Sequence, residues 1–81
     1  MPTVLRIDGY RFFFYSNEGV EPYHIHVSSG DCAAKYWIDP VALADNIGFR
    51  APELNKIKII VIQHRETFKE AWNEHFSEKN Q

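Results

Sequence analysis

Two histidines, His24 and His26, stand two positions apart in a segment rich in β-branched residues. Because side chains alternate between the two faces of a β-strand, this spacing sends both imidazoles out of one face and Ile25 and Val27 out of the other. Imidazole changes its charge near neutral pH and is a common ligand of transition metals. The pair therefore indicates acid–base chemistry, metal binding or a polar contact surface.

These three interpretations need different neighbours. For RNA cleavage without a metal, one histidine would act as base and the other as acid, with Arg11 or Arg65 stabilising the charge that develops on the phosphate. A divalent-metal site would need a third ligand such as Asp39, Glu21 or a residue of the long helix, and the spacing of the sequence fixes none. It is left open whether the chain is an enzyme. No cofactor is expected, because the sequence has no phosphate-binding glycine loop and no paired cysteine motif.

The elements that would position the pair form an α+β fold. Strands are expected at residues 4–7 and 10–15, joined by an Asp8-Gly9 turn that suits a type I′ hairpin, and at residues 23–28 and 33–38. A short helix at 41–47 would end at Gly48. A long helix would run from Pro52 to about Phe76, because apolar residues recur there every three or four positions, even through the β-branched stretch 56–63. The prediction is a four-stranded antiparallel sheet with one short and one long C-terminal helix packed on one face.

The 81 residues predict a single domain, with the sheet in residues 1–38, the helices in 39–76 and a frayed tail at 77–81. The net charge of -2 requires any nucleic-acid role to depend on a locally basic surface. A lone Cys32 and the lack of a signal-peptide pattern favour the cytoplasm. The apolar runs are far shorter than the ~20 residues of a membrane span.

If the more apolar side of each strand faces the helices, the other side of the sheet is cationic and aromatic. This open face would carry no carboxylate, and it would present Val4, Arg6, Arg11, Phe13, Tyr15, His24, His26, Lys35 and Trp37. Aromatic rings and cations suit RNA, which stacks its bases and binds through phosphates. The same residue types are enriched where proteins bind one another. RNA and a partner protein are therefore both candidate ligands of this face.

A second copy of the chain is a further candidate partner. Three isoleucines of the long helix, Ile59, Ile60 and Ile62, widen its apolar stripe beyond what one sheet needs. Such a helix is buried on two sides or contacts another chain. A homodimer is therefore one of the expected assemblies.

Several blocks of the chain resemble the bacterial "domain of unknown function 4160" family. They cover residues 1–7 and 9–18, Glu21-Pro22-x-His24-x-His26-Val27, Ala34-Lys35-x-Trp37, and His64-Arg65-Glu66 with Ala71-Trp72. The resemblance implies a short cytoplasmic protein encoded beside another small domain, in an arrangement like a toxin–antitoxin pair. It implies no catalytic residues. The expected function is an interaction module that contacts a small partner protein from the neighbouring gene, or RNA, through the open face.

Overall fold

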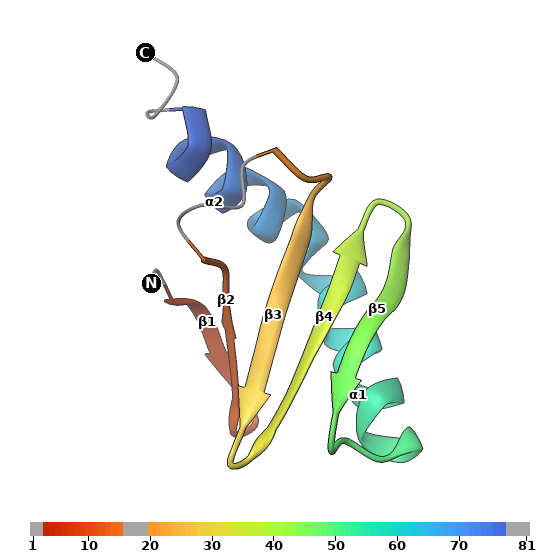
Figure 1. Cartoon of the computed structure of the whole chain (residues 1–81). Helices are drawn as coiled ribbons and strands as arrows, with labels where there is room; N and C mark the ends of the chain where they lie inside the picture. Colours follow the sequence, from red (N-terminus) through yellow and green to blue (C-terminus); the bar gives the residue numbers. More distant parts are fainter. Residues whose placement is uncertain (1–2, 16–19, 78–81) are drawn as a thin grey trace.

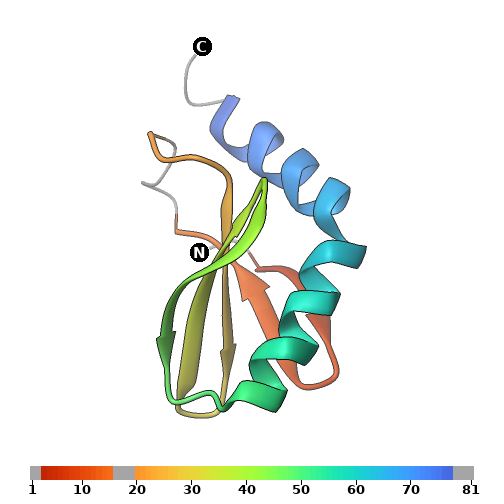
Figure 2. The same ribbon diagram turned by 90° about the vertical axis from the view of Figure 1, so that its right-hand side faces the viewer.

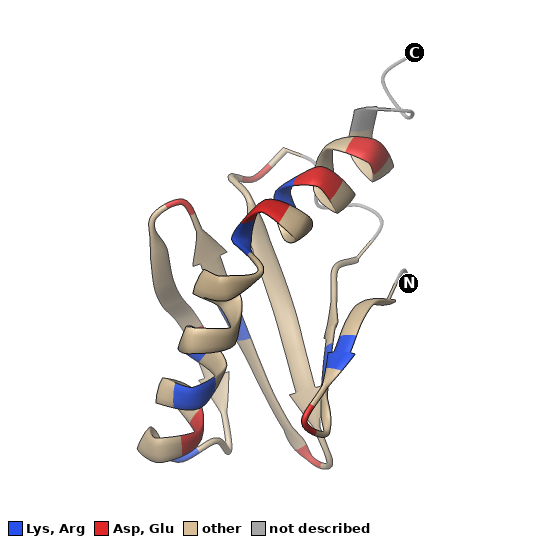
Figure 3. Cartoon of the chain, turned by 180° about the vertical axis from the view of Figure 1, so that it is seen from behind, with Lys and Arg blue, Asp and Glu red and all other residues tan. Residues whose placement is uncertain are grey.

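The computed structural model describes residues 3–15 and 20–77 of the chain. One antiparallel sheet contains, in sequence order, β1 (Thr3–Ile7), β2 (Tyr10–Phe13), β3 (His24–Ser29), β4 (Cys32–Ile38) and β5 (Val41–Ile47). Two helices follow, α1 (Ala51–Gln63) and α2 (Arg65–Ser77). Both lie on one side of the sheet, behind it in Figure 1 and in front of it in Figure 3. Figure 2 shows them following one another along the sheet. The predicted α+β class is confirmed.

The segment 41–47 is the main correction to the predicted elements. It was expected to form a short helix, and this prediction is wrong, because it is a fifth strand that pairs with β4 from Ile38↔Val41 to Ala33↔Ile47. Asp39 and Pro40 form the turn between the two strands. A helix of seven residues is too short to be stable without packing, whereas pairing with β4 satisfies the backbone directly. The sheet therefore extends beyond residue 38 to Ile47.

The first hairpin has the expected turn and one irregularity. Asp8 and Gly9 both have positive φ angles, 52° and 83°, as a type I′ turn requires. The register shifts between Thr3 and Leu5, so that Val4 has no directly opposite partner. A bulge of this kind changes which face a side chain takes. Val4 consequently packs against the core, and its predicted place on the open face is wrong.

The core fills the space between the sheet and the two helices. Strand alternation predicted its sheet side correctly, since Ile25, Val27, Tyr36 and Ile38 are all almost completely buried. The helices contribute the buried residues Ile57, Ile60, Val61, Phe68, Trp72 and Phe76. The β-branched stretch 56–63 lies in α1, as the apolar stripe predicted.

The predicted long helix is divided at His64. This residue has φ −111° and ψ 19°, and its Nδ1 lies 3.0 Å from the carbonyl oxygen of Ile60. A side chain that binds a carbonyl one turn back competes with the regular backbone pattern, and α2 starts at the next residue. Ser77 is the last residue of α2, and residues 78–81 of the expected frayed tail lie outside the described residues.

Polar contacts fasten α2 to the loops at one end of the sheet. The Tyr23 hydroxyl donates a hydrogen bond to Asn73 Oδ1 at 2.8 Å. Lys69 Nζ lies 3.0 Å from Asp39 Oδ2, in the turn between β4 and β5. These contacts fix α2 over the start of β3 and the end of β4, where His24 and Trp37 lie.

We expect Ile57→Ala to destabilise the domain by about 2–5 kcal/mol, because Ile57 is 0% exposed and its removal leaves a cavity. The matched control is Ile59→Ala in the same helix, where 54% of the residue is exposed. Its cost should stay within about 0.5 kcal/mol. Urea unfolding followed by circular dichroism measures both, and equal losses would contradict this packing of α1.

The hydrogen bond from Lys69, together with its charge and that of Arg65, lowers the pKa of Asp39 below 3.8. A carboxyl whose pKa is lower in the folded state stabilises the fold above its unfolded pKa, and this stabilisation is lost as the pH falls through the folded pKa. In Lys69→Met the pKa of Asp39 should rise toward 3.8. The carboxyl ¹³C shift followed by NMR against pH tests this, and an unchanged midpoint would refute the assignment.

Candidate functional site on the open face of the sheet

Strand pairing brings the predicted residues of the middle strands onto one face. Phe13 of β2 pairs with His26 of β3, and His26 pairs with Lys35 of β4. Two residues further along each strand, His24 pairs with Trp37. Residues that pair directly across antiparallel strands share a face, so the strand pairing places these five residues on the same face of the sheet.

Two arginines extend this patch toward β1. Arg6 pairs directly with Arg11 across β1 and β2, so both side chains leave the same face of the sheet. Arg11 Nε donates a hydrogen bond to Thr3 Oγ1 at 2.9 Å, and its guanidinium carbon lies 4.3 Å from the centre of the Phe13 ring. The ring and the hydroxyl hold Arg11 flat against the sheet, while Arg6 is exposed.

His26 lies in the centre of an aromatic cluster. Its ring centre is 5.6 Å from that of Phe13 in a stacked arrangement, and 4.7 Å from that of Tyr15 in an edge-to-face arrangement. Tyr15 is 41% exposed, and His26 is half-buried. Tyr15 and His26, with Ala33, Lys35, Asp45 and Ile47, line a shallow hollow of about 220 Å³. This hollow is the concave part of the open face.

His24 is placed differently from the prediction, because its side chain is 0% exposed. Its ring centre lies 5.2 Å from that of His26, 5.8 Å from Trp37 and 4.8 Å from Trp72 of α2. Nδ1 lies 2.9 Å from the carbonyl oxygen of Pro22 and therefore donates its hydrogen to that oxygen. The expectation of two accessible imidazoles is wrong for His24.

The burial of His24 follows from where β2 and β3 separate. Their pairing ends at Phe13↔His26, and the next residue, Phe14, packs into the core. Trp72 contacts Phe14, with ring centres 5.5 Å apart, as well as His24. The indole therefore covers the start of β3 where β2 no longer does. Apolar periodicity places either Ala71 or Trp72 on the buried stripe of the helix, but it carries no information on which strand the indole ring reaches.

The open face also carries carboxylates, contrary to expectation. Glu21 Oε1 lies 2.7 Å from Lys35 Nζ, and Asp45 of β5 pairs with Lys35 across the strands. Lys35 Nζ also lies 4.6 Å from the centre of the Trp37 ring. Glu21 stands in a loop and Asp45 in the segment expected to be helical, so the strand pattern could not place either carboxylate on this face. The surface is cationic and aromatic with acidic groups at its rim.

The geometry gives little support to a metal site. Glu21 Oε1 is 3.9 Å from His24 Nδ1, whose hydrogen already points to the Pro22 carbonyl. The carboxylate of Asp39 is bound to Lys69. Among residues 3–15 and 20–77, no three His, Cys, Asp or Glu side chains converge in a way that could hold a metal ion.

Comparison with known families identifies the chain. A family model described as a domain of unknown function, DUF4160, matches residues 9–73. The chain belongs to the DUF4160 family. The matched segment of this DUF4160 domain contains both histidines, Trp37 and Trp72, so it includes the open face and the residue that closes it. No match was found among curated proteins or solved structures. Across the described residues, neither helix has the length and hydropathy needed to cross a membrane.

The two histidines should respond differently to removal. We expect His24→Ala to destabilise this DUF4160 domain by about 2–4 kcal/mol, because it leaves a cavity beneath Trp72 and removes a buried hydrogen bond. His26→Ala, at a half-buried position, should cost about 1 kcal/mol or less. Chemical unfolding of both variants measures the difference. If His26→Ala were the more damaging change, the described burial would be wrong.

Proposed function

We propose that this DUF4160 domain is a small cytoplasmic interaction module of a bacterial, toxin–antitoxin-like gene pair. Its open face binds the small partner protein encoded by the neighbouring gene. The observation that carries the proposal is the patch itself, in which Arg6, Arg11, Tyr15, His26 and Trp37 stand together on one face of the sheet. Arginine, tyrosine and tryptophan are the residues that most often dominate protein–protein binding energy.

The exposure of the rings favours a protein partner over RNA. A base needs an uncovered ring face on which to stack. Phe13 is only 5% exposed beneath Arg11, and Lys35 lies over Trp37. Cations held over the rings present directed charge at a protein interface, whereas an RNA base that stacked on the rings would first have to displace the cations.

Acid–base catalysis by the histidine pair is the rival function. A general base must come within hydrogen-bond reach of the proton that it removes. His24 is fully buried, and its ring centre lies 5.2 Å from that of His26, a separation that leaves no room for a phosphate group between the rings. Both features favour a binding role for the face.

The proposal is tested by co-expressing the domain with the product of the neighbouring gene and measuring their affinity by calorimetry. We expect a complex that Arg11→Ala and Trp37→Ala each weaken about tenfold or more. The control is Lys58→Ala, which removes an exposed cation from α1, on the other side of the sheet. Circular dichroism of each variant confirms that a loss of binding is not a loss of folding.

Three results would overturn the proposal. The first is the absence of any complex, together with no effect on growth when the domain is expressed alone. The second is RNA cleavage that His24→Ala and His26→Ala abolish while both variants stay folded, which would establish the rival enzyme. The third is tight binding of a labelled single-stranded RNA that requires Trp37, without a protein partner.

A homodimer would use a different surface. Ile59 and Ile62 of α1 are 54% and 50% exposed, and Leu43 of β5 is 45% exposed. These side chains lie away from the open face, so a second copy bound there would leave that face available. Light scattering on the isolated domain and on its complex distinguishes the two assemblies.

A further inference from the structure

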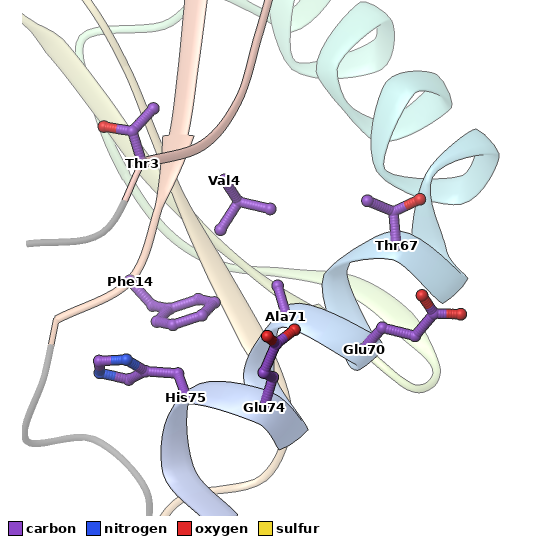
Figure 4. A pocket seen from close by; sticks show the side chains of 8 residues that line it. All are labelled: Thr3, Val4, Phe14, Thr67, Glu70, Ala71, Glu74 and His75. Carbon is purple, nitrogen blue, oxygen red and sulfur yellow. The ribbon is translucent and has the colours of Figure 1, made fainter. Parts of the chain in front are cut away.

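A groove separates β1 from α2 on the helix side of the sheet. It has a volume of about 460 Å³ and is lined by residues of β1, of the segment that follows β2 and of α2. Its lining includes the apolar side chains of Val4, Phe14 and Ala71, and the His75 ring lies beside Phe14 (Figure 4). Figure 4 shows Glu70 and Glu74 extending from α2 along one side of it. Because β1 is an edge strand, no further strand of the sheet closes the groove on its outer side.

The basic and acidic side chains of α2 lie on different sides of the helix. Arg65 and Lys69 act on Asp39, on the flank toward the turn between β4 and β5. Glu66, Glu70 and Glu74 follow one another at intervals of four residues, and the acidic groups along α2 are visible in Figure 3. Like charges at this interval destabilise a helix slightly. Among the described residues none of these three glutamates has an ion pair within 4.0 Å, so a bound cation would relieve the repulsion.

The spacing of the two glutamates in the groove fits an extended chain. Residues four apart in an α-helix are separated by about 6 Å along the axis. Alternate residues of an extended strand are separated by about 6.8 Å and point the same way. Two basic side chains at alternate positions of an extended segment would therefore meet the two carboxylates together. A groove of this volume has room for such side chains but not for a whole helix.

We propose that this groove binds an extended segment of a partner protein that carries arginines at alternate positions. The guanidinium groups pair with Glu70 and Glu74, and small apolar side chains lie against Val4 and Ala71. Arginine suits this role because its planar group forms two parallel hydrogen bonds to a carboxylate. The groove lies on the opposite side of the sheet from the open face, so this site is independent of the function proposed above.

The test uses the ¹⁵N-labelled domain and the peptide acetyl-Val-Arg-Val-Arg-Val-amide. We expect amide shifts in β1 and in the part of α2 that contains Glu70 and Glu74, with binding in the sub-millimolar to millimolar range that weakens as salt is added. The doubly substituted variant Glu70→Gln/Glu74→Gln should bind about tenfold more weakly. A peptide with citrulline in place of both arginines, which removes the charge and keeps the shape, should lose binding to a similar degree.

Two matched variants make the test specific. Glu66→Gln removes an equal charge from the same helix outside the groove, and Trp37→Ala alters the open face. Both should bind the peptide within about twofold of the unchanged domain. The proposal is overturned if the arginine peptide produces no shifts, if the citrulline peptide binds equally well, or if Glu66→Gln weakens binding as much as the double substitution does. It is also overturned if Trp37→Ala abolishes the shifts, since the peptide would then occupy the open face.

Discussion

The packing of Trp72 against the start of β3 is the constraint on which the rest of the molecule depends. Beyond Phe13↔His26 the strands β2 and β3 separate, and the space at that point must be filled. The indole of Trp72 fills it, in contact with Phe14 and with His24, and Phe76 packs against it with ring centres 4.3 Å apart. One side chain thus completes the core and covers an imidazole. The position of α2 therefore decides that His24 is covered while His26 remains partly accessible.

Two cationic side chains of the open face are held in place by contacts within the domain. Arg11 is held by Thr3 and the Phe13 ring, and Lys35 is held by Glu21 and the Trp37 ring. Side chains already held in this way lose little further conformational freedom when a partner binds. Their charges are also partly balanced before binding, which lowers the cost of removing water from them. Both effects favour association with a preformed, complementary protein surface.

The sequence predicts those features that depend on local periodicity. Alternation in β3 and β4 and the apolar stripe of the helices were sufficient for the core positions of Ile25, Tyr36 and Phe68, and for placing His26 beside Lys35 and Trp37. Features that depend on contacts between distant segments could not be predicted. Residues 41–47 are a strand because β4 offers a partner, and Val4 changes face because of a bulge. His24 is buried because a residue 48 positions later reaches it, a contact with no local pattern.

The two edges of the sheet bear on how this domain can meet other molecules. A bulge interrupts β1 at Val4, and the register of β5 shifts where Tyr36 pairs with Leu43 and Lys35 with Asp45, which leaves Ala44 without an opposite residue. Irregularities of this kind disrupt the regular row of donors and acceptors that another strand would need, and they protect edges against indiscriminate pairing. The pairing of a strand from another molecule with β1 or β5 is therefore the least suited mode of association. The chemistry available for recognition is concentrated instead on the cationic, aromatic open face and in the acidic groove behind it. Because the two proposed sites differ in the sign of their charges and lie on opposite sides of the sheet, we expect each of them to bind a different ligand surface.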